Sequence, residues 1–309
     1  MVMGATGAVG QHLLPVLIDD GHEVVAVTRT PAKADALRAL GALPVVADAL
    51  DREAVLGAVA GAEPEVVVHQ MTALTGTIDM RRFDRTFAQT NRLRTEGTRH
   101  LLDAARAAGA RRVIAQSYTG WPFAREGALV KDEDAALDPA PPKAQRESLA
   151  AIAECERLVR AHPGGVVLRY GGFYGPGTSL NAGGGDITEA VRKRRFPVVG
   201  DGGGVWSFTH ISDAASGVVA ALGDAAPAGT YAIVDDDPAP VREWLPALAA
   251  AVGARPPRHV PLWLGRLAAG EVPAVMMTAS RGASNARAKA VLGWEPRVPS
   301  WREGFRQAL

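Results

Sequence analysis

Short apolar segments alternate with segments of helical periodicity along the first half of the chain. Runs rich in β-branched residues predict strands at 23–28, 43–47, 65–69, 112–116 and 165–170. Between them, apolar residues recur at helical spacing, as at 11–18, 32–40, 51–60 and 144–162. Strands that alternate with helices pair in parallel, so the pattern predicts an α/β fold with a Rossmann-type, doubly wound parallel sheet.

The regular alternation ends after Tyr170, where a glycine-rich stretch begins. We expect a short segment at 206–211 and a strand at 230–234 to return to the sheet, and the rest of the chain to be mostly helical with proline interruptions. The predicted division is a dinucleotide-binding Rossmann domain, 1–171 plus about 206–235, and a smaller C-terminal cap, about 172–205 plus 236–309. Ligands of open α/β sheets bind beyond the carboxyl ends of the strands, where such a cap would close over them.

Three glycines stand at the start of the chain, directly behind an apolar Met-Val-Met segment. Gly4, Gly7 and Gly10 recur at every third residue, and a helical pattern follows them. This spacing allows a strand to turn sharply into a helix whose free N–H groups and positive dipole end face a pyrophosphate. A plain strand-to-helix turn would use similar glycines, but the strand–helix–strand context favours a dinucleotide site.

Composition narrows the class of protein. The 309 residues are 47% hydrophobic and carry a net charge of +1, which gives no electrostatic basis for binding nucleic acid or an anionic membrane. A single cysteine, Cys155, cannot form an internal disulfide, so we expect a cytoplasmic protein. No apolar run approaches the roughly 18 residues of a membrane span, and no Cys/His cluster has the spacing of metal ligands.

Four further motifs occur in a fixed order: 91–98, ending in Glu-Gly-Thr; Tyr174-Gly-Pro-Gly; 208–213, Phe-Thr-His-Ile-Ser-Asp; and 292–296, Leu-Gly-Trp-Glu-Pro. With the glycines, they resemble the extended short-chain dehydrogenase/reductase superfamily, of the NAD(P)-dependent epimerase/dehydratase type. The resemblance implies an NAD(P) cofactor. The cofactor contacts that we expect are Gly4, Thr6, Gly7, Ala8, Val9, Gly10, Arg29, Lys33, Asp48, Ala49, His69, Gln70, Asn91, Tyr170, Gly171 and Phe173. For His69, a hydrogen-bonded packing role is the leading alternative.

The chain lacks the catalytic pair of the family it resembles, a Tyr followed four residues later by a Lys. None of its four Tyr has such a partner, and alignment puts Ser148 and Ile152 at the two positions. In that family the Lys lowers the Tyr pKa, so that the phenol can exchange a proton near neutral pH. A replacement acid would be Tyr118 or Ser117, which follow the fifth predicted strand, although Tyr118 could equally pack against nearby aromatic residues.

The second predicted strand ends in Thr28-Arg29, without the acidic residue that binds the ribose hydroxyls of NAD. Arg29 can bind a 2′-phosphate, and Lys33 lies one helical turn further on. Asp48, after the third strand, would lie near the adenine. We therefore predict that NADP(H) is preferred over NAD(H).

The expected substrate is a small, uncharged carbonyl or hydroxyl compound. In relatives that use nucleotide-diphosphate sugars, an Arg grips the diphosphate two residues before the Phe of the histidine/aspartate segment; here that residue is Trp206. Unless Arg281 or an arginine of 192–195 takes over, such sugars should not be substrates. We expect an aromatic pocket that contains Trp121, Tyr174 and Trp206. Two alternatives stay open: a non-redox isomerase or lyase, and a non-catalytic NADP-sensing regulator. A homodimer is also left open.

Overall fold

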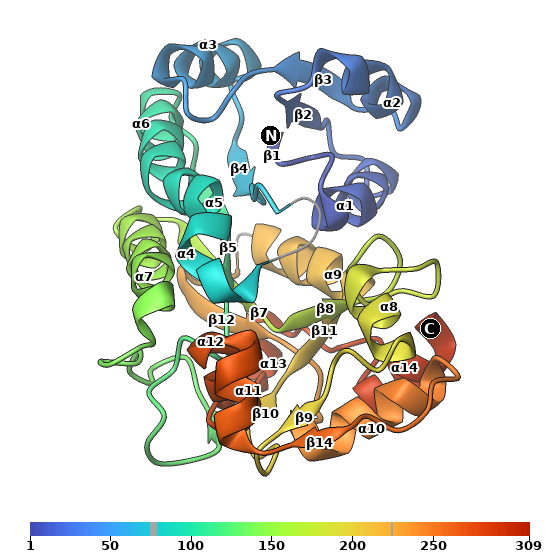
Figure 1. Cartoon of the computed structure of the whole chain (residues 1–309). Coiled ribbons are helices and arrows are strands. Elements are labelled where there is room, and N and C mark those ends of the chain that lie inside the picture. Colours follow the sequence, from blue (N-terminus) through green and yellow to red (C-terminus); the bar gives the residue numbers. More distant parts are fainter. Residues whose placement is uncertain (75–78, 224) are drawn as a thin grey trace.

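The computed structural model describes residues 1–74, 79–223 and 225–309. Its centre is a seven-stranded, all-parallel sheet in the order β12-β7-β5-β4-β1-β2-β3 (Figure 1). The strands are β1 (Val2–Met3), β2 (Val25–Thr28), β3 (Leu43–Val46), β4 (Val66–His69), β5 (Arg112–Tyr118), β7 (Gly165–Tyr170) and β12 (Gly229–Ile233). This order reverses direction between β1 and β4, so the predicted doubly wound Rossmann-type sheet is confirmed.

Helices cover both faces of this sheet, because alternate residues of each buried strand point to opposite sides. Ala26, Val68 and Ile114 pack on one face, and their neighbours Val27 and Val67 pack on the other. The first face carries α1 (Ala8–Asp19), α2 (Ala34–Ala39) and α9 (Ile211–Leu222). The second carries α3 (Arg52–Ala62), α6 (Thr98–Ala107) and α7 (Arg146–Arg160).

The segment between β4 and α6 is a chain of short helical pieces rather than one long helix. They are η2 (Met80–Arg82), α4 (Phe83–Thr86), α5 (Ala88–Arg92) and the π-helical turn η3 (Leu93–Gly97), which continues into α6. A π-helical turn changes the direction of the side chains that follow it and is frequent at functional sites. Another short turn, η1 (Pro31–Lys33), follows β2, and η4 (Lys143–Gln145) leads into α7.

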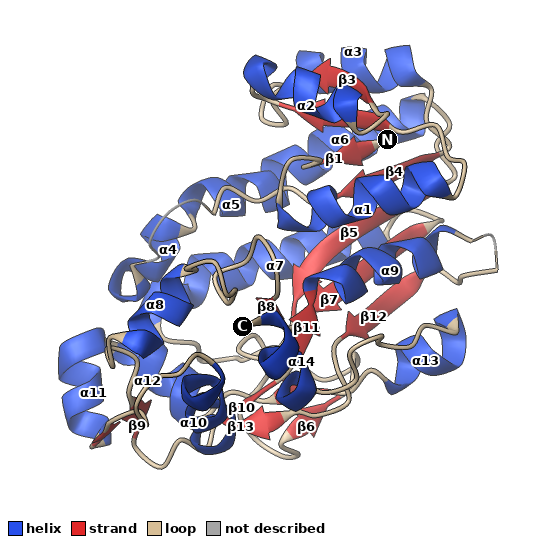
Figure 2. Cartoon of the chain, turned by 90° about the vertical axis from the view of Figure 1, so that its right-hand side faces the viewer, coloured by secondary structure: helices blue, strands red, loops and turns tan. Residues whose placement is uncertain are grey.

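A second, mostly helical region lies beyond the carboxyl ends of the central strands (Figure 2). Its core is aromatic, with Trp244, Trp301, Phe208 and Phe305 fully buried together. Its helices are α8 (Asp186–Arg192), α10 (Val241–Ala251), α11 (Leu262–Ala269), α12 (Glu271–Thr278) and α14 (Trp301–Ala308); α13 (Ala286–Leu292) packs against the central sheet. Among the described residues, no helix is both long and apolar enough to cross a membrane.

Short strands join this region into four two-stranded sheets. They pair β10 (Val205–Trp206) with β13 (Ala239–Pro240), β11 (Phe208–His210) with β8 (Gly172–Tyr174), β14 (His259–Val260) with β9 (Val198–Val199), and β15 (Gly282–Ala283) with β6 (Val130–Lys131). The expected strand at 230–234 does join the central sheet, as β12. The expectation that 206–211 also returns to it was wrong. Phe208 packs into the aromatic core of the second region, which holds β11 away from the main sheet.

Candidate cofactor and substrate site

The turn from β1 into α1 is built so that only glycine fits. Gly4 has a φ of +84°, and a Cβ atom there would lie 2.5 Å from the backbone oxygen of Gln70. A Cβ at Gly10 would lie 2.4 Å from the oxygen of Ala5. Gly7 caps α1 without a side chain, so no side-chain oxygen of the turn caps the first N–H groups of the helix. Such a helix start forms a cradle for a phosphate group.

Two cations lie at the carboxyl end of β2. Arg29 and Lys33 are exposed, and neither has a hydrogen-bond or ion-pair partner within the described part of the chain. After β3, the exposed Asp48 carboxylate accepts the Leu50 N–H at 2.9 Å, whereas Ala49 is buried. The end of β2 therefore presents free positive charge to solvent, where a phosphate would gain from it.

The side chain of His69, at the end of β4, is fully used inside the protein. Its Nδ1 accepts the Met71 N–H at 3.2 Å, so Nε2 carries the proton and donates to the Thr98 hydroxyl at 3.1 Å. Burial lowers the His69 pKa to about 4, which keeps the ring neutral. This side chain is a packing residue, the alternative role that the sequence left open. The next residue, Gln70, is buried, and its Oε1 has no partner among the described residues.

The residues at the carboxyl end of β7 pack into the hydrophobic core of the central sheet. Tyr170 is buried, its hydroxyl donates to the Ala214 carbonyl at 3.4 Å, and burial raises its pKa. Its ring lies 5.2 Å from that of the half-buried Phe173. A Cβ at Gly171 would lie 2.4 Å from the Ser207 oxygen, so the chain can pass there only as glycine. Contact between these residues and a cofactor stays a prediction.

The positions of the missing catalytic pair are occupied by a structural serine and a core residue. The Ser148 hydroxyl donates to Asp84 Oδ1 at 2.6 Å and accepts from Asn91 Nδ2 at 3.0 Å. Ile152, one turn further along α7, is buried. The Asn91 Oδ1 atom is buried without a partner in the described structure, so this amide retains a free acceptor. Neither Ser148 nor Ile152 can lower the pKa of a phenol, because neither side chain carries a positive charge.

Ser117 does not face the pocket. Its hydroxyl donates to Glu156 Oε1 at 2.6 Å, and the same carboxylate forms a buried two-point ion pair with Arg169, at 2.8 and 2.7 Å. Successive residues of a strand point to opposite faces. Ser117 therefore turns toward α7 and the next residue, Tyr118, turns away from it. The Ser117 hydroxyl is thus engaged away from the pocket, and its catalytic role stays a prediction that this geometry does not favour.

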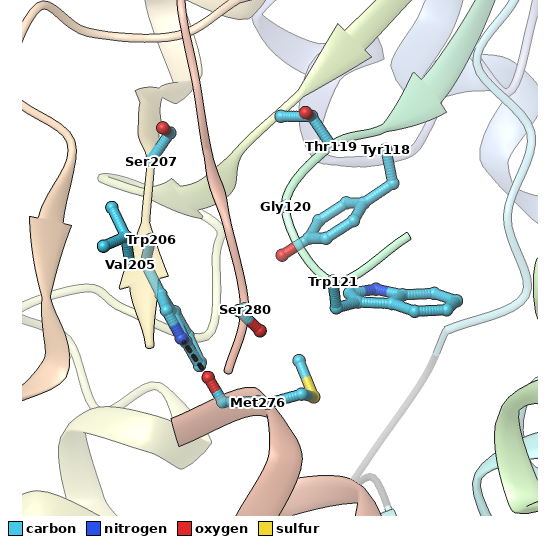
Figure 3. Close-up of a pocket in the computed structure, with 9 residues that line it drawn as sticks. All are labelled: Tyr118, Thr119, Gly120, Trp121, Val205, Trp206, Ser207, Met276 and Ser280. Atoms are coloured by element: carbon cyan, nitrogen blue, oxygen red, sulfur yellow. Dashed lines mark hydrogen bonds between the residues drawn. The ribbon is translucent and has the colours of Figure 1, made fainter. Parts of the chain in front are cut away.

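Tyr118 lies at a narrow pocket between the end of β5 and the helical region (Figure 3). Its hydroxyl points into the pocket and has no partner within the described residues, and burial raises its pKa to about 12. The free volume of about 10 Å³ is no more than one water molecule needs, so a substrate requires side chains to move. The lining residues are Tyr118, Thr119, Gly120, Trp121, Val205, Trp206, Ser207, Met276 and Ser280.

Of the three residues predicted for the substrate pocket, the structure brings two together. Trp121 and Trp206 lie on opposite sides of the pocket, and the Trp206 Nε1–H donates to the Met276 carbonyl at 2.9 Å. Tyr174 is not among the lining residues. It is fully buried with its ring edge-on to those of His210, at 5.1 Å, and Phe305, at 5.3 Å. The pairing of β8 with β11 carries Tyr174 into the aromatic core of the second region.

Several residues of the site were missed by the sequence analysis. Thr119 lines the pocket with a buried Oγ1 that has no partner in the described residues; its place directly after Tyr118 was a signal that could have found it. Asp84 and Met276 have no such signal, because they reach the site from segments distant in sequence. No group of three or more His, Cys, Asp or Glu side chains that could hold a metal occurs within 1–74, 79–223 and 225–309.

Comparison with known proteins assigns the family. The model of the NAD dependent epimerase/dehydratase family matches residues 1–233. A 3-diazoavenalumate denitrifying reductase of a Streptomyces species is 47% identical over 309 residues, covering 99% of this chain and 98% of the relative. The chain belongs to the NAD dependent epimerase/dehydratase family.

A more distant relative agrees with this assignment, and a solved structure has the same fold. A 2-alkyl-3-oxoalkanoate reductase of Stenotrophomonas maltophilia is 30% identical over 266 residues, covering 82% of this chain and 76% of the relative. The crystal structure of a UDP-glucose 4-epimerase with UDP-glucose, from Thermotoga maritima, has a TM-score of 0.75 at 22% identity and covers 99% of this chain and 96% of that one. The matches support an NAD-dependent oxidoreductase of the epimerase/dehydratase family.

The residues of this chain fit the nicotinamide cofactor that the family description implies. The cradle of Gly4, Gly7 and Gly10 is open where a side chain would block a pyrophosphate. Two buried acceptors, Gln70 Oε1 and Asn91 Oδ1, have no partner in the described residues. Gln70 follows β4 and its backbone lies next to Gly4, whereas Asn91 contacts Ser148 on α7. Unpaired buried polar atoms are costly, and a bound ligand that donates hydrogen bonds would satisfy them.

Proposed function

We propose that this protein is an NADPH-dependent reductase that removes the diazo group from an aromatic substrate. The observation that carries the proposal is the replacement of the family's Tyr–Lys pair by Ser148, held by Asp84, and by the buried Ile152. Carbonyl reduction needs a proton donor for the developing alkoxide, and a positioned acid contributes about 10²–10⁴-fold to the rate. A substrate that accepts a hydride without also needing a proton suits this site better than a carbonyl compound does.

A diazonium group is such an acceptor. When bound, the reduced nicotinamide would supply a hydride, that is, one proton together with two electrons. A bond from this hydrogen to the terminal nitrogen converts the aryl diazonium cation into a neutral aryl diazene. The carbon–nitrogen and N–H bonds of the diazene then break, N₂ leaves, and a C–H bond forms at the ring carbon. The sum is an aryl diazonium cation plus hydride giving arene plus N₂, without any proton from the protein. The 47% identical relative named as a diazo-compound denitrifying reductase supports this reading.

The pocket has the chemistry that such a substrate requires. Tyr118, Trp121 and Trp206 line it, and no lining residue within the described chain carries a charge. Aromatic faces attract a flat cation by about 0.5–2 kcal/mol, whereas a cationic side chain would repel it. Protein side chains in this pocket therefore favour an aromatic diazonium ion.

Nucleotide-diphosphate sugars are not proposed as substrates. Trp206 holds the position from which an Arg grips the diphosphate in relatives of that type, and its single N–H is already donated to Met276. Two arginines that could have taken over are engaged elsewhere. Arg281 donates to the backbone oxygens of Ala279 and Arg125, and Arg192 pairs with Glu189. We further propose NADP(H) as the preferred cofactor, on the free charge of Arg29 and Lys33.

Carbonyl reduction is the second candidate, and one observation favours it. The Tyr118 hydroxyl points into the pocket, has no partner within the described structure, and is held neutral by a pKa of about 12. A neutral phenol can donate a hydrogen bond to a carbonyl oxygen, and the relative that is 30% identical is named as an oxoalkanoate reductase. In this reaction Tyr118 would be the unusual proton donor.

One variant separates the two candidates. The purified protein is assayed with an aryl diazonium salt and with a β-keto acid, by NADPH oxidation and by N₂ release. Under the diazo proposal, Tyr118→Phe keeps the N₂-forming rate within about threefold, because the substrate needs no acid. Under the carbonyl alternative, Tyr118→Phe loses roughly 10²-fold or more of ketone reduction. Tyr231→Phe is the matched control, since its hydroxyl donates to the Pro227 carbonyl away from the pocket.

Two results would count against the proposal. N₂ release no faster than in buffer, together with efficient ketone reduction, would replace it by the carbonyl candidate. NADPH binding without oxidation by either class of compound would favour the non-catalytic NADP-sensing role or the non-redox lyase that the sequence left open.

A further inference from the structure

One guanidinium nitrogen lies buried beside α7 without a partner among the described residues. Arg94 belongs to the π-helical turn η3, and its Nη1 atom is buried with no hydrogen-bond or ion-pair partner among the described residues. Desolvation lowers the Arg94 pKa, although a guanidinium still stays charged at any physiological pH. Arg94 is half-buried, but a buried nitrogen of a charged group without a partner still needs an explanation, because its desolvation destabilises the folded state.

Two contacts locate this cation along α7. Asn91 donates to Ser148 near the start of α7, and the Thr98 hydroxyl lies 3.6 Å from the Cys155 sulfur further on. The segment from α5 through η3 to α6 thus runs beside α7 in the same direction, and Arg94 falls between the two contacts. Between Ser148 and Cys155, α7 buries Leu149, Ala151 and Ile152, and Ile152 is the most deeply buried of the three. Arg94 therefore lies beside the stretch of α7 that contains Ile152, the position where the family would have its Lys.

The neighbouring groups do not neutralise Arg94. Glu156, which attracts it, is already occupied by the two-point ion pair with Arg169 and by Ser117. Burial raises the Cys155 pKa to about 11, so the thiol stays protonated and neutral at pH 7. His69, whose pKa Arg94 helps to lower, is neutral as well. The guanidinium groups of Arg94 and Arg169 thus share one carboxylate, that of Glu156. The positive charge of Arg94 therefore remains available to a ligand.

We propose that Arg94 replaces the missing Lys as the cation that binds the nicotinamide half of the cofactor, with Asn91 as its companion acceptor. One turn apart on the same segment, they offer one free donor, Nη1, and one free acceptor, Oδ1. A ribose hydroxyl both donates and accepts, so a pair of ribose hydroxyls would satisfy both atoms. This inference rests on the cofactor of the proposed function and is independent of the proposed diazo substrate.

The test compares two ligands that differ only in the nicotinamide half. Dissociation constants of NADPH and of 2′,5′-ADP, which lacks that half, are measured by calorimetry for wild type, Arg94→Met and Arg94→Lys. Loss of a charge-assisted hydrogen bond weakens binding by about 10- to 150-fold. We expect this loss for NADPH in Arg94→Met, partial rescue in Arg94→Lys, and unchanged affinity for 2′,5′-ADP. Arg106→Met is the control, because Arg106 lies on the exposed side of α6 and pairs with Asp103.

The melting temperature of the ligand-free protein is the second readout. Because Arg94 has no partner, Arg94→Met should melt at the same temperature as wild type or higher. A lower melting temperature with unchanged NADPH affinity would show a structural role and overturn the inference. Equal weakening of both ligands would overturn it too, since the effect would not lie at the nicotinamide. Wild-type protein that binds neither NADPH nor NADH would overturn the proposed function and this inference together.

Discussion

Replacing Arg29 by alanine measures how the protein chooses between NADP(H) and NAD(H). Arg29 stands directly after β2, is exposed, and has no partner within the described residues; Lys33 lies close behind it in η1. Neither side chain supports the fold, so the substitution removes positive charge without removing a contact. Arg29→Ala should therefore unfold at the wild-type temperature and differ only in how it binds the 2′-phosphate.

The magnitude follows from the exposure of the site. A hydrogen bond to a charged group contributes about 1.5–3 kcal/mol, and contacts in solvent fall at the lower end of the range. About 1.5 kcal/mol corresponds to a loss of roughly tenfold in NADPH affinity. Lys33→Ala removes only a solvated point charge and should cost about 0.3–1 kcal/mol, or twofold to fivefold. NADH lacks the 2′-phosphate, so its affinity should hardly change in either variant.

The assay is a titration of NADPH and NADH into wild type, Arg29→Ala and Arg29→Ala/Lys33→Ala, at about 0.05 and 0.5 M salt. Screening at high salt should shrink the preference for NADPH. Arg38→Ala is the control, because Arg38 is an exposed arginine on α2 that already pairs with Asp35. Equal wild-type affinities for the two nucleotides, or a preference that survives the double substitution, would refute the assignment of Arg29.

Two further substitutions test the glycine cradle and the pH dependence of stability. Gly10→Ala places a Cβ 2.4 Å from the Ala5 oxygen, so it should weaken nucleotide binding more than 100-fold, as measured by calorimetry. Gly57→Ala is the control, because Gly57 is exposed and a Cβ there meets nothing within 4 Å. Urea unfolding should show that this control stabilises the protein, through α3, by about 1 kcal/mol. Burial raises the pKa of Asp235 to about 8, so the folded protein keeps a proton that the unfolded chain releases near pH 4. Stability should therefore fall as the pH rises from 4 through 8, by at least about 1 kcal/mol, and Asp235→Asn should flatten the curve; the same slope in both proteins would contradict this.

The sequence alone was enough to predict the architecture and the glycine turn between β1 and α1. Alternating apolar runs and helical periods depend on local side-chain spacing, and they predicted the parallel sheet that the structure contains. The glycine spacing predicted the turn into α1, where positive φ and close backbone contacts exclude a side chain. The absence of a Tyr–Lys pair is also a property of the sequence, and it already ruled out the usual proton donor of the family.

Tertiary packing decided which side chains reach the site. Periodicity shows that Ser117 and Tyr118 point in opposite directions but not which of them faces α7; the buried Glu156 and Arg169 pair decides that. The path of β8 beside β11 carries Tyr174 into the aromatic core.

Arg94 resembled any other arginine of a helical segment in the sequence. Only the packing of η3 against α7 shows that its Nη1 atom is buried without a partner in the described residues. Local spacing is encoded over a few residues, whereas burial and charge pairing depend on segments that are distant in sequence and meet only when the chain has folded.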